Sequence, residues 1–393
     1  MKVLIVASKY LPEYSGAGHR IHKTYQRLKN KEKDIEYEVL CSSIEFEKSE
    51  QYVYEGVTIE RIGKIKGLWR FGSYGEAALT WRALKRKTFD IIHVVGISNV
   101  TAAAIYYARI NHIPLIIELV THDASPNQSL PGVHYFWRPD FKAQTGLLSI
   151  SEHLTEKCNH LGYNDIVWGR PNPVDEQLFS PPKNKSDLRQ KLTPFSEKDI
   201  VLLMIAKFIP QKNQIFLLDV LKELPDSYKL VLAGPTVSSG SLKNRDSQYI
   251  EAIQSKIQAL GLENRVFLKV GFVDAAAYMQ ASDIYVMPNI AEGFGTPILE
   301  ALSCGLPVVA NKAESSFRQF SDIEIVHLCD LDKNQWKEAV LSQRFDRDIA
   351  LNCAEKIRSL YSTEKVDSTF YKLLKHIASL GKEEKPNLKE ALR

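Results

Sequence analysis

Short apolar runs recur along the whole chain, and they constrain its fold more than any other feature. Many of these runs are continuous in Val, Ile and Leu rather than alternating with polar residues, and longer amphipathic stretches separate them. Continuous runs are typical of parallel strands covered on both faces, with helices in the stretches between them. The predicted strands are residues 3–7, 37–41, 57–62, 91–95, 115–119 and 146–150, followed by 200–206, 229–233, 266–270, 284–287, 307–310 and 323–328.

Both halves of the 393-residue chain repeat this pattern of strand and helix. At roughly 150 residues per domain, the length suits two or three domains. Parallel strands joined by helices require right-handed crossovers, so we predict an α/β protein with two Rossmann-like, doubly wound domains facing a cleft. We place the first domain at residues 1–175 and the second at 199–362.

A proline-rich segment lies between the two halves. Residues 170–187 contain four prolines and little periodicity, which is typical of a connection rather than of a regular element. We therefore assign residues 176–198 as a linker. The helical sequence 363–393 has no strand to accompany it, and we expect it to join the first domain.

Composition excludes several classes of protein. The 51 basic and 47 acidic residues give a net charge of +4, too small to indicate nucleic-acid binding. The five cysteines are scattered without CxxC spacing, which argues against a disulfide framework or a zinc site. No apolar stretch approaches the roughly 20 residues that span a bilayer. These features predict a cytoplasmic protein.

The most informative loop is residues 288–310, which follows a predicted strand and contains Glu292 and a Gly-Phe-Gly turn. Thr296 and Pro297 suit the N-cap and first position of a helix, and Gly305 suits the residue just past its end. Glycines let backbone N–H groups approach a ligand closely, and a helix N-terminus favours an anionic or oxygen-rich group. The pattern predicts a ligand-binding loop.

Two glutamates of this loop should reach different parts of one ligand, because Glu292 precedes the helix and Glu300 lies about one turn inside it. A carboxylate accepts paired hydrogen bonds from vicinal hydroxyls well. The segment AEGFGTPILEALSCGLPVVA resembles the retaining glycosyltransferase family numbered four, which has the two-Rossmann "B" (GT-B) fold. The resemblance implies transfer of a hexose-type sugar from a nucleoside-diphosphate sugar to an acceptor hydroxyl, with retention at the anomeric carbon.

The resemblance also implies roles for individual residues of this loop. Glu292 and the adjoining turn would hold the sugar, and Glu300 would hold the ribose. The remaining donor-binding residues of the turn are Gly293, Phe294, Gly295 and Thr296.

A second loop, MIAKFIPQKNQ, resembles the diphosphate-binding loop of the same family. Lys207 and Lys212 occupy the places of its two cations, although many members carry Arg at the first place. Lys207 supplies charge without a bidentate fork. Two cations suit a leaving diphosphate, since they stabilise the charge that grows as the glycosidic bond breaks. The alternative is a pair of solvated surface lysines.

Three weaker signals complete the predicted donor site. The Ser-Gly-Ala-Gly turn at Gly16 resembles the family's small glycine loop beside the diphosphate, although a simple turn would read the same. His122 takes the place of a histidine that contacts the donor sugar; the alternative is an ordinary polar-loop histidine. The turn where the nucleoside base lies in the family corresponds to Gly271, Phe272 and Val273.

No metal or cofactor is predicted besides the donor substrate. Asp330 and Asp332 form a literal DxD motif, but they lack neighbouring acids of metal-cage type, and we interpret them as a solvated helix start. The resemblance implies a catalytic set of Glu292, Lys212, Lys207 and His122.

The stretch 62–89 concentrates seven basic residues against one acidic residue, a net charge of +6, with interleaved aromatic residues. Such a stretch suits contact with an anionic membrane, and equally an amphipathic helix with solvated basic residues. We expect a saccharide or lipid-linked acceptor, as in bacterial surface polysaccharide or glycolipid synthesis. We expect the protein to lie in the cytoplasm or at the inner face of the plasma membrane. The alternatives are a nucleotide-sugar epimerase and a nucleotide-sugar-binding protein without turnover.

Overall fold

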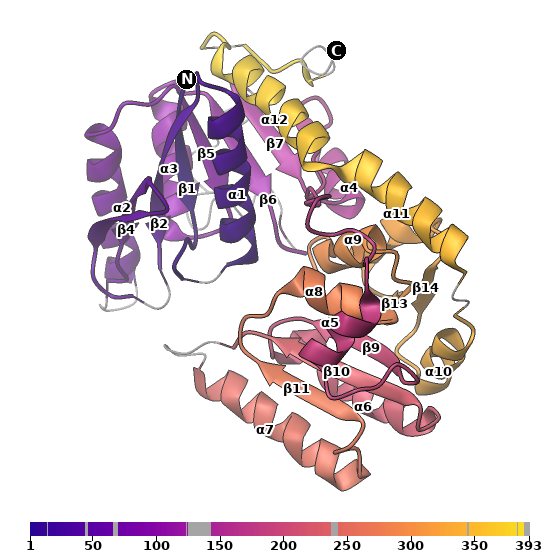
Figure 1. The fold of residues 1–393 in the computed structure, drawn as a ribbon. Coiled ribbons are helices and arrows are strands. Elements are labelled where there is room, and N and C mark those ends of the chain that lie inside the picture. Colours follow the sequence, from indigo (N-terminus) through magenta and orange to yellow (C-terminus); the bar gives the residue numbers. More distant parts are fainter. Residues whose placement is uncertain are drawn as a thin grey trace. The chain divides into compact units, whose positions relative to one another are not determined.

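The computed structural model describes residues 1–13, 15–43, 46–65, 70–122, 124, 143–236, 243–343, 346–382 and 384–388. The chain divides into two compact units (Figure 1). Met1–Asn172 and Glu364–Arg393 form the first unit, and Pro173–Thr363 form the second. The first crossing between them lies three residues before the boundary predicted at residue 175.

The first unit contains an eight-stranded sheet in the order β3-β4-β2-β1-β5-β6-β7-β8. Its strands are parallel except β3, which is antiparallel to β4. The strands are β1 (Lys2–Ala7), β2 (Glu36–Ser42), β3 (Glu50–Tyr54), β4 (Val57–Ile62), β5 (Ile91–Val95), β6 (Leu115–Leu119), β7 (Thr145–Ser149) and β8 (Val167–Gly169). The helices are α1 (Gly16–Lys31), α2 (Arg70–Lys85), α3 (Asn99–Ile110), α4 (Glu152–His160) and α12 (Thr363–Ala378).

The second unit contains a six-stranded parallel sheet in the order β11-β10-β9-β12-β13-β14. The strands are β9 (Ile200–Ile205), β10 (Tyr228–Gly234), β11 (Val266–Val270), β12 (Ile284–Met287), β13 (Val308–Asn311) and β14 (Val326–Cys329). The α-helices are α5 (Lys185–Leu192), α6 (Gln214–Glu223), α7 (Lys243–Leu260), α8 (Ala275–Ala281), α9 (Thr296–Ser303), α10 (Lys333–Leu341) and α11 (Arg347–Tyr361). Two 3₁₀ helices, η1 (Pro210–Lys212) and η2 (Ser315–Phe320), complete it.

The stretch predicted as a linker, 176–198, is part of the second unit instead. It contains α5, which lies against α8. Arg189 on α5 donates to the Ala281 carbonyl at 2.9 Å and to Asp283 at 2.7 Å. Prolines thus mark where the chain leaves the first unit, but the amphipathic turn after them packs as an ordinary helix.

The C-terminal helix α12 buries one face in the core of the first unit. Phe370, Leu373, Leu374 and Ile377 recur at helical spacing and are fully buried among residues of β1, β5 and α1. Gly146 on β7 lets this helix approach, since a side chain there would lie 2.3 Å from Ile377. The segment without a strand of its own therefore completes the first unit.

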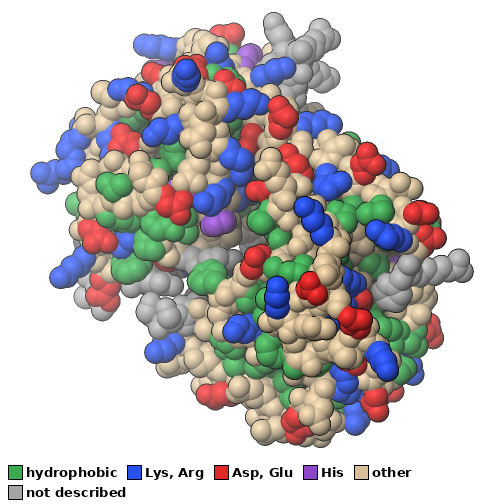
Figure 2. Space-filling model, in the orientation of Figure 1, with side chains coloured by type: hydrophobic (Ala, Val, Ile, Leu, Met, Phe, Trp, Pro, Cys, Tyr) green, Lys and Arg blue, Asp and Glu red, His purple; other side chains and the backbone are tan. Residues whose placement is uncertain are grey.

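Basic and acidic side chains are interspersed on the face shown in Figure 2. This distribution agrees with the small net charge of the chain, +4.

Candidate functional site

The sheet order of the second unit identifies where a ligand would bind. Strands β10 and β11 lie on one side of β9, whereas β12, β13 and β14 lie on the other. Ligands of open α/β sheets bind outside the carboxyl ends of the strands, where the strand order reverses. The lysine loop follows β9 and the Glu292 loop follows β12, so the two segments singled out by sequence flank this point.

Side chains from the two loops meet in an ion pair. Lys212 Nζ lies 2.5 Å from Glu292 Oε2, and Asn289 donates to the same oxygen at 2.9 Å. The Lys212 and Glu292 side chains remain 19% and 22% exposed, so a ligand can reach both. The backbones are joined as well, because the Ile290 N–H donates to the Gln211 carbonyl at 3.0 Å.

The lysine loop is held by its own backbone. The turn η1 ends at Lys212, and Asn213 then adopts a left-handed conformation with φ 55° before α6 begins. Asparagine tolerates this conformation better than most residues. Gln214 on α6 donates to the Lys207 carbonyl at 2.8 Å, which fixes the loop where it leaves β9. Lys207 and Lys212 therefore lie on one short segment whose backbone is held by hydrogen bonds.

The Glu292 loop ends at helix α9. Gly295 takes the N-cap position with φ 88°, and a side chain there would lie 3.0 Å from the Phe317 ring. Thr296 is thus the first helical residue, one place after the N-cap predicted for it. Gly305, with φ 78°, follows the helix as predicted.

Glu300 lies on α9 behind this loop, and burial raises the pKa of its carboxyl to about 8. Desolvation penalises the charged form, whereas hydrogen bonds donated to a carboxylate favour it. Hydroxyl groups of a ligand that donate to Glu300 would therefore stabilise its ionised form, which burial alone disfavours.

Glycines shape the neighbouring edge of the same sheet. A side chain at Gly234 would lie 2.0 Å from the Ala206 carbonyl oxygen, so only glycine lets β10 end against the lysine loop. Gly271 has φ 129°, and its N–H donates to the Gly234 carbonyl at 2.8 Å. Phe272 follows with 72% of its surface exposed, and Val273 is partly exposed beside it.

The first unit has an equivalent reversal point between β1 and β5. The predicted glycine loop is the first turn of α1, where Ser15 accepts the Gly18 N–H at 3.2 Å. Among the described residues, and apart from its chain neighbours and the backbone of its own helix, no atom lies within 4 Å of where a side chain at Gly16 would begin. Gly96 after β5 was not predicted from its motif; a side chain there would lie 2.3 Å from Ser8 Oγ.

His122 follows β6 at the same edge of the first unit. Its ring stacks on His153 of α4 with centroids 5.3 Å apart and planes 20° apart. His153 could not be predicted from the sequence, because a single histidine at a helix start has no distinctive spacing.

The DxD motif is a helix start. Asp332 caps α10 by accepting the backbone N–H groups of Asn334 and Gln335 at 3.0 and 2.9 Å. Among the described residues, no three His, Cys, Asp or Glu side chains are grouped as metal ligands.

The basic stretch 62–89 is less uniform than its sequence suggests, and its residues 66–69 lie outside the described part of the chain. Lys87 is only 10% exposed and pairs with Glu38 at 2.5 Å and with Glu60 at 3.3 Å. Arg86 also pairs with Glu60, at 2.8 Å. Among the α2 side chains that the structure describes, the exposed basic ones are Arg82 and Lys85, and Tyr74 and Leu79 are exposed on the same helix.

Two doubly wound units define the class of two-Rossmann, or GT-B, proteins. Solved structures share this architecture. The crystal structure of Anabaena Alr3699/HepE in complex with UDP and glucose matches with a TM-score of 0.72 and 18% identity, over 95% of this chain and 99% of that one. Sucrose-phosphate synthase from Thermosynechococcus elongatus matches with a TM-score of 0.76 and 15% identity, over 95% and 98%.

Residues 185–338 match the family described as glycosyl transferases group 1. It is 28% identical over 244 residues to the UDP-Gal:alpha-D-GlcNAc-diphosphoundecaprenol alpha-1,3-galactosyltransferase of Escherichia coli. It is 32% identical over 246 residues to the phosphatidyl-myo-inositol mannosyltransferase of Mycobacterium leprae. These alignments cover 59% and 61% of this chain and 60% of each relative's length.

Proposed function

We propose that this protein transfers a hexose-type sugar from a nucleoside-diphosphate sugar to an acceptor hydroxyl, with retention at the anomeric carbon. The observation that carries the proposal is the contact between Lys212 and Glu292 at the reversal point of the second sheet. One carboxylate for sugar hydroxyls and one cation for a diphosphate stand side by side there, as a glycosyl diphosphate requires.

The chemistry needs no nucleophile from the protein. The leaving diphosphate takes the proton of the acceptor hydroxyl as the new glycosidic bond forms and the bond to the diphosphate breaks. Lys207 and Lys212 stabilise the charge that grows on the diphosphate, which is the largest catalytic contribution expected here. Glu292 and the turn after it orient the sugar, Glu300 holds the ribose and His122 contacts the sugar.

A ligand screen followed by an assay tests the proposal. A ligand that binds only the folded state stabilises it in proportion to the logarithm of its concentration over its dissociation constant. One of UDP-, GDP- and ADP-sugars should therefore raise the melting temperature most. Release of nucleoside diphosphate that requires an acceptor supports transfer, whereas an epimer formed from the donor alone indicates an epimerase. A melting shift without any turnover indicates a binding protein.

The reaction is expected to be metal-independent, because two lysines take the place of a metal at the diphosphate and Asp332 serves as a helix cap. The initial rate of transfer should be unchanged when excess EDTA is added. Loss of activity in EDTA, with recovery on adding Mg²⁺ or Mn²⁺, would contradict this expectation.

We further propose a lipid-linked acceptor reached at the inner face of the plasma membrane. The names of both relatives refer to lipid-linked or lipid substrates, diphosphoundecaprenol and phosphatidylinositol. Within the described residues, no helix is both long and apolar enough to cross a membrane. Peripheral docking through the exposed face of α2 would bring the protein to such a substrate.

Docking through the exposed Arg82 and Lys85 of α2 predicts salt-sensitive membrane binding. Each basic residue near an anionic surface contributes roughly 1 kcal/mol, and salt screens the attraction. The protein should sediment with phosphatidylglycerol vesicles at low salt and be released at high salt. Arg82→Glu with Lys85→Glu should abolish sedimentation, whereas Lys191→Glu with Lys198→Glu, on exposed residues of the second unit, should not. Wild-type protein that stays in the supernatant at low salt would show that α2 is a solvated face.

A further inference from the structure

A segment that begins at the last residue of β13 supports the Glu292 loop from behind. We name residues 311–320 the brace. Three hydrogen bonds join the two segments: Asn311 Nδ2 donates to the Asn289 carbonyl at 2.9 Å, the Glu292 N–H donates to Glu314 Oε2 at 3.0 Å, and Gln319 Nε2 donates to the Phe294 carbonyl at 3.1 Å. The brace therefore contacts the loop before, at and after Glu292.

Glu314 is the buried polar centre of the brace, with 1% of its surface exposed. Its second oxygen, Oε1, accepts the Ser316 N–H at 3.0 Å, which caps η2. A buried carboxylate is costly unless hydrogen bonds satisfy it, and charge-assisted bonds to backbone N–H groups are among the stronger ones. Glu314 thus ties the backbone of Glu292 to a fixed helical turn.

The apolar side of the brace fixes the end of the same loop. Phe317 and Phe320 lie against Gly295, where a side chain would meet their rings at 3.0 and 3.3 Å. Phe294 packs edge-on against Phe320, with ring centroids 5.8 Å apart. Both rings of the brace are fully buried, so the loop lies on a close-packed support.

We propose that Glu314 is a positioning residue for sugar binding: by holding the Glu292 amide, it sets where the Glu292 carboxylate meets Lys212 and the donor sugar. This inference rests on the proposed function of the site. The amide of Glu292 is engaged with Glu314, and the Gly293 N–H donates to Glu292 Oε1 at 3.1 Å, so the carboxylate of Glu292 is the group of this residue that can meet the sugar. A small displacement of such a group can cost up to about a hundredfold in rate.

The first test needs no donor. Glu314→Gln keeps the shape but turns one accepting oxygen into an N–H₂ group that faces a donor. Amide hydrogen exchange of the peptide covering residues 290–296 should become at least about tenfold faster than in wild type. Glu324→Gln, an exposed glutamate of the same unit, removes the same charge and should leave this exchange unchanged.

The second test separates positioning from general stability. The affinity ratio between UDP-galactose and UDP, or between the sugar and nucleotide pair selected by the screen, should fall about tenfold or more in Glu314→Gln. The affinity for the bare nucleotide should stay near wild type. Gln319→Ala, which removes another bond of the brace and keeps the buried charge, should shift the ratio in the same direction by less.

Two outcomes overturn the inference. One is a Glu314→Gln variant whose loop exchange and affinity ratio both equal those of wild type. The other is an equal loss of affinity for UDP and UDP-galactose, which would mean that Glu314 only stabilises the unit. If wild-type protein itself binds no nucleotide sugar, the proposed function fails, and the exchange experiment still decides whether Glu314 holds the loop.

Discussion

Replacing Lys212 with alanine is expected to lower the rate of sugar transfer by at least about tenfold, because a charge-assisted hydrogen bond contributes roughly 1.5–3 kcal/mol and each 1.4 kcal/mol is tenfold in rate. The structure gives this residue two tasks. Its ammonium group lies at the reversal point where the diphosphate is proposed to bind, and it contacts Glu292 at 2.5 Å. The measurement is the initial rate of transfer with the nucleotide sugar selected by the screen.

Matched variants separate the two tasks of Lys212. Lys198→Ala removes an exposed lysine of the same unit and should leave the rate unchanged. Glu292→Gln leaves the lysine in place, so it should bind bare nucleoside diphosphate at least as tightly as wild type while losing most transfer. Lys212→Ala should instead weaken the binding of the bare nucleotide. Wild-type rates in Lys212→Ala would contradict the assignment of this loop to the diphosphate.

The strands predicted from the sequence were those with a run of apolar residues. Each of the twelve predicted runs overlaps a strand, and strands such as β1, β5 and β6 are largely apolar because both of their faces are covered. In the part of the chain that the structure describes, the two strands that were not predicted, β3 and β8, lie at opposite edges of the first sheet. The residues of β3 are exposed or only partly buried, and β8 has only three residues, so neither strand presents a long apolar run.

The turn before β4 shows why such an edge is hard to predict. Glu55 and Gly56 both have positive φ, 45° and 77°. Glutamate is an unusual residue in a two-residue hairpin turn of this kind, which favours Asn-Gly or Asp-Gly. Its carboxylate accepts a hydrogen bond from Gln26 at 2.8 Å and lies 3.3 Å from the Lys23 ammonium, so residues of α1 stabilise the turn. A contact across about thirty residues leaves no local sequence signal.

The same reasoning applies to the candidate site. Motifs identified the lysine and glutamate loops, because glycines, prolines and charges recur there at fixed spacing. The pairing of Lys212 with Glu292 joins residues 80 positions apart, and the contact between Glu314 and Glu292 spans 22 positions. Such partners are set by the order of strands in the sheet, which places the ends of β9, β12 and β13 side by side. Periodicity predicts the strands but not this order.

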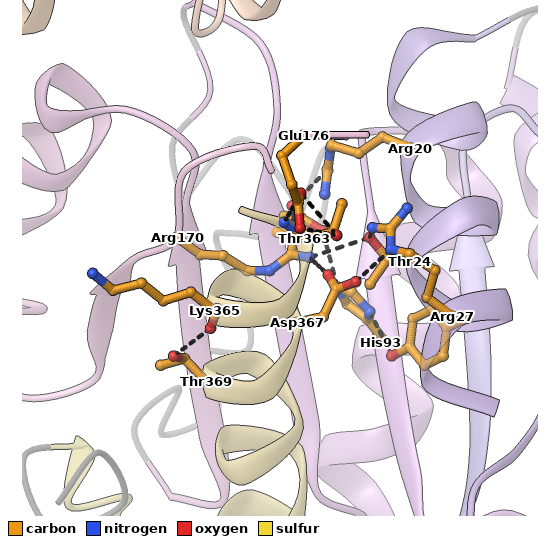
Figure 3. A network of polar contacts seen from close by, with 12 residues as sticks. Arg20, Thr24, Arg27, His93, Arg170, Glu176, Thr363, Lys365, Asp367 and Thr369 are labelled. Carbon is orange, nitrogen blue, oxygen red and sulfur yellow. Dashed lines mark hydrogen bonds and ion pairs between the residues drawn. The ribbon is translucent and has the colours of Figure 1, made fainter. Parts of the chain in front are cut away.

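The second large effect is expected on stability, and it concerns a buried charge network in the first unit (Figure 3). Glu118 on β6 is 2% exposed and accepts from Arg20 at 2.6 Å and from Arg170 at 3.4 Å, while His93 Nε2 lies 3.2 Å from its second oxygen. Arg170 also stacks on the Phe370 ring of α12 at 4.3 Å. The network therefore joins α1, the central strands and the C-terminal helix.

Replacing Glu118 with glutamine should lower the free energy of unfolding by about 3–5 kcal/mol, because it removes the carboxylate that Arg20 and Arg170 share and leaves Arg170 only the more distant Asp367, at 3.8 Å. For a unit of this size that corresponds to a melting temperature lower by roughly 6–20 °C, measured by calorimetry at pH 7. Glu364→Gln is the matched control, since Glu364 is 80% exposed and pairs with Lys31 at the surface, and it should cause no measurable change.

The pH dependence of this difference follows from the pKa of Glu118. Burial alone would raise that pKa, but Arg20, His93 and Arg170 outweigh burial and hold it well below its ordinary value. A lowered carboxyl pKa stabilises the folded state fully above the unfolded value, about 4.3, and the contribution is lost as pH falls through the folded value. The gap in melting temperature between wild type and Glu118→Gln should therefore stay constant from pH 8 to 5 and shrink below about pH 4. A gap that is already closing between pH 7 and 5, or equal stability of the two proteins at pH 7, would show that the arginines do not depend on an ionised Glu118.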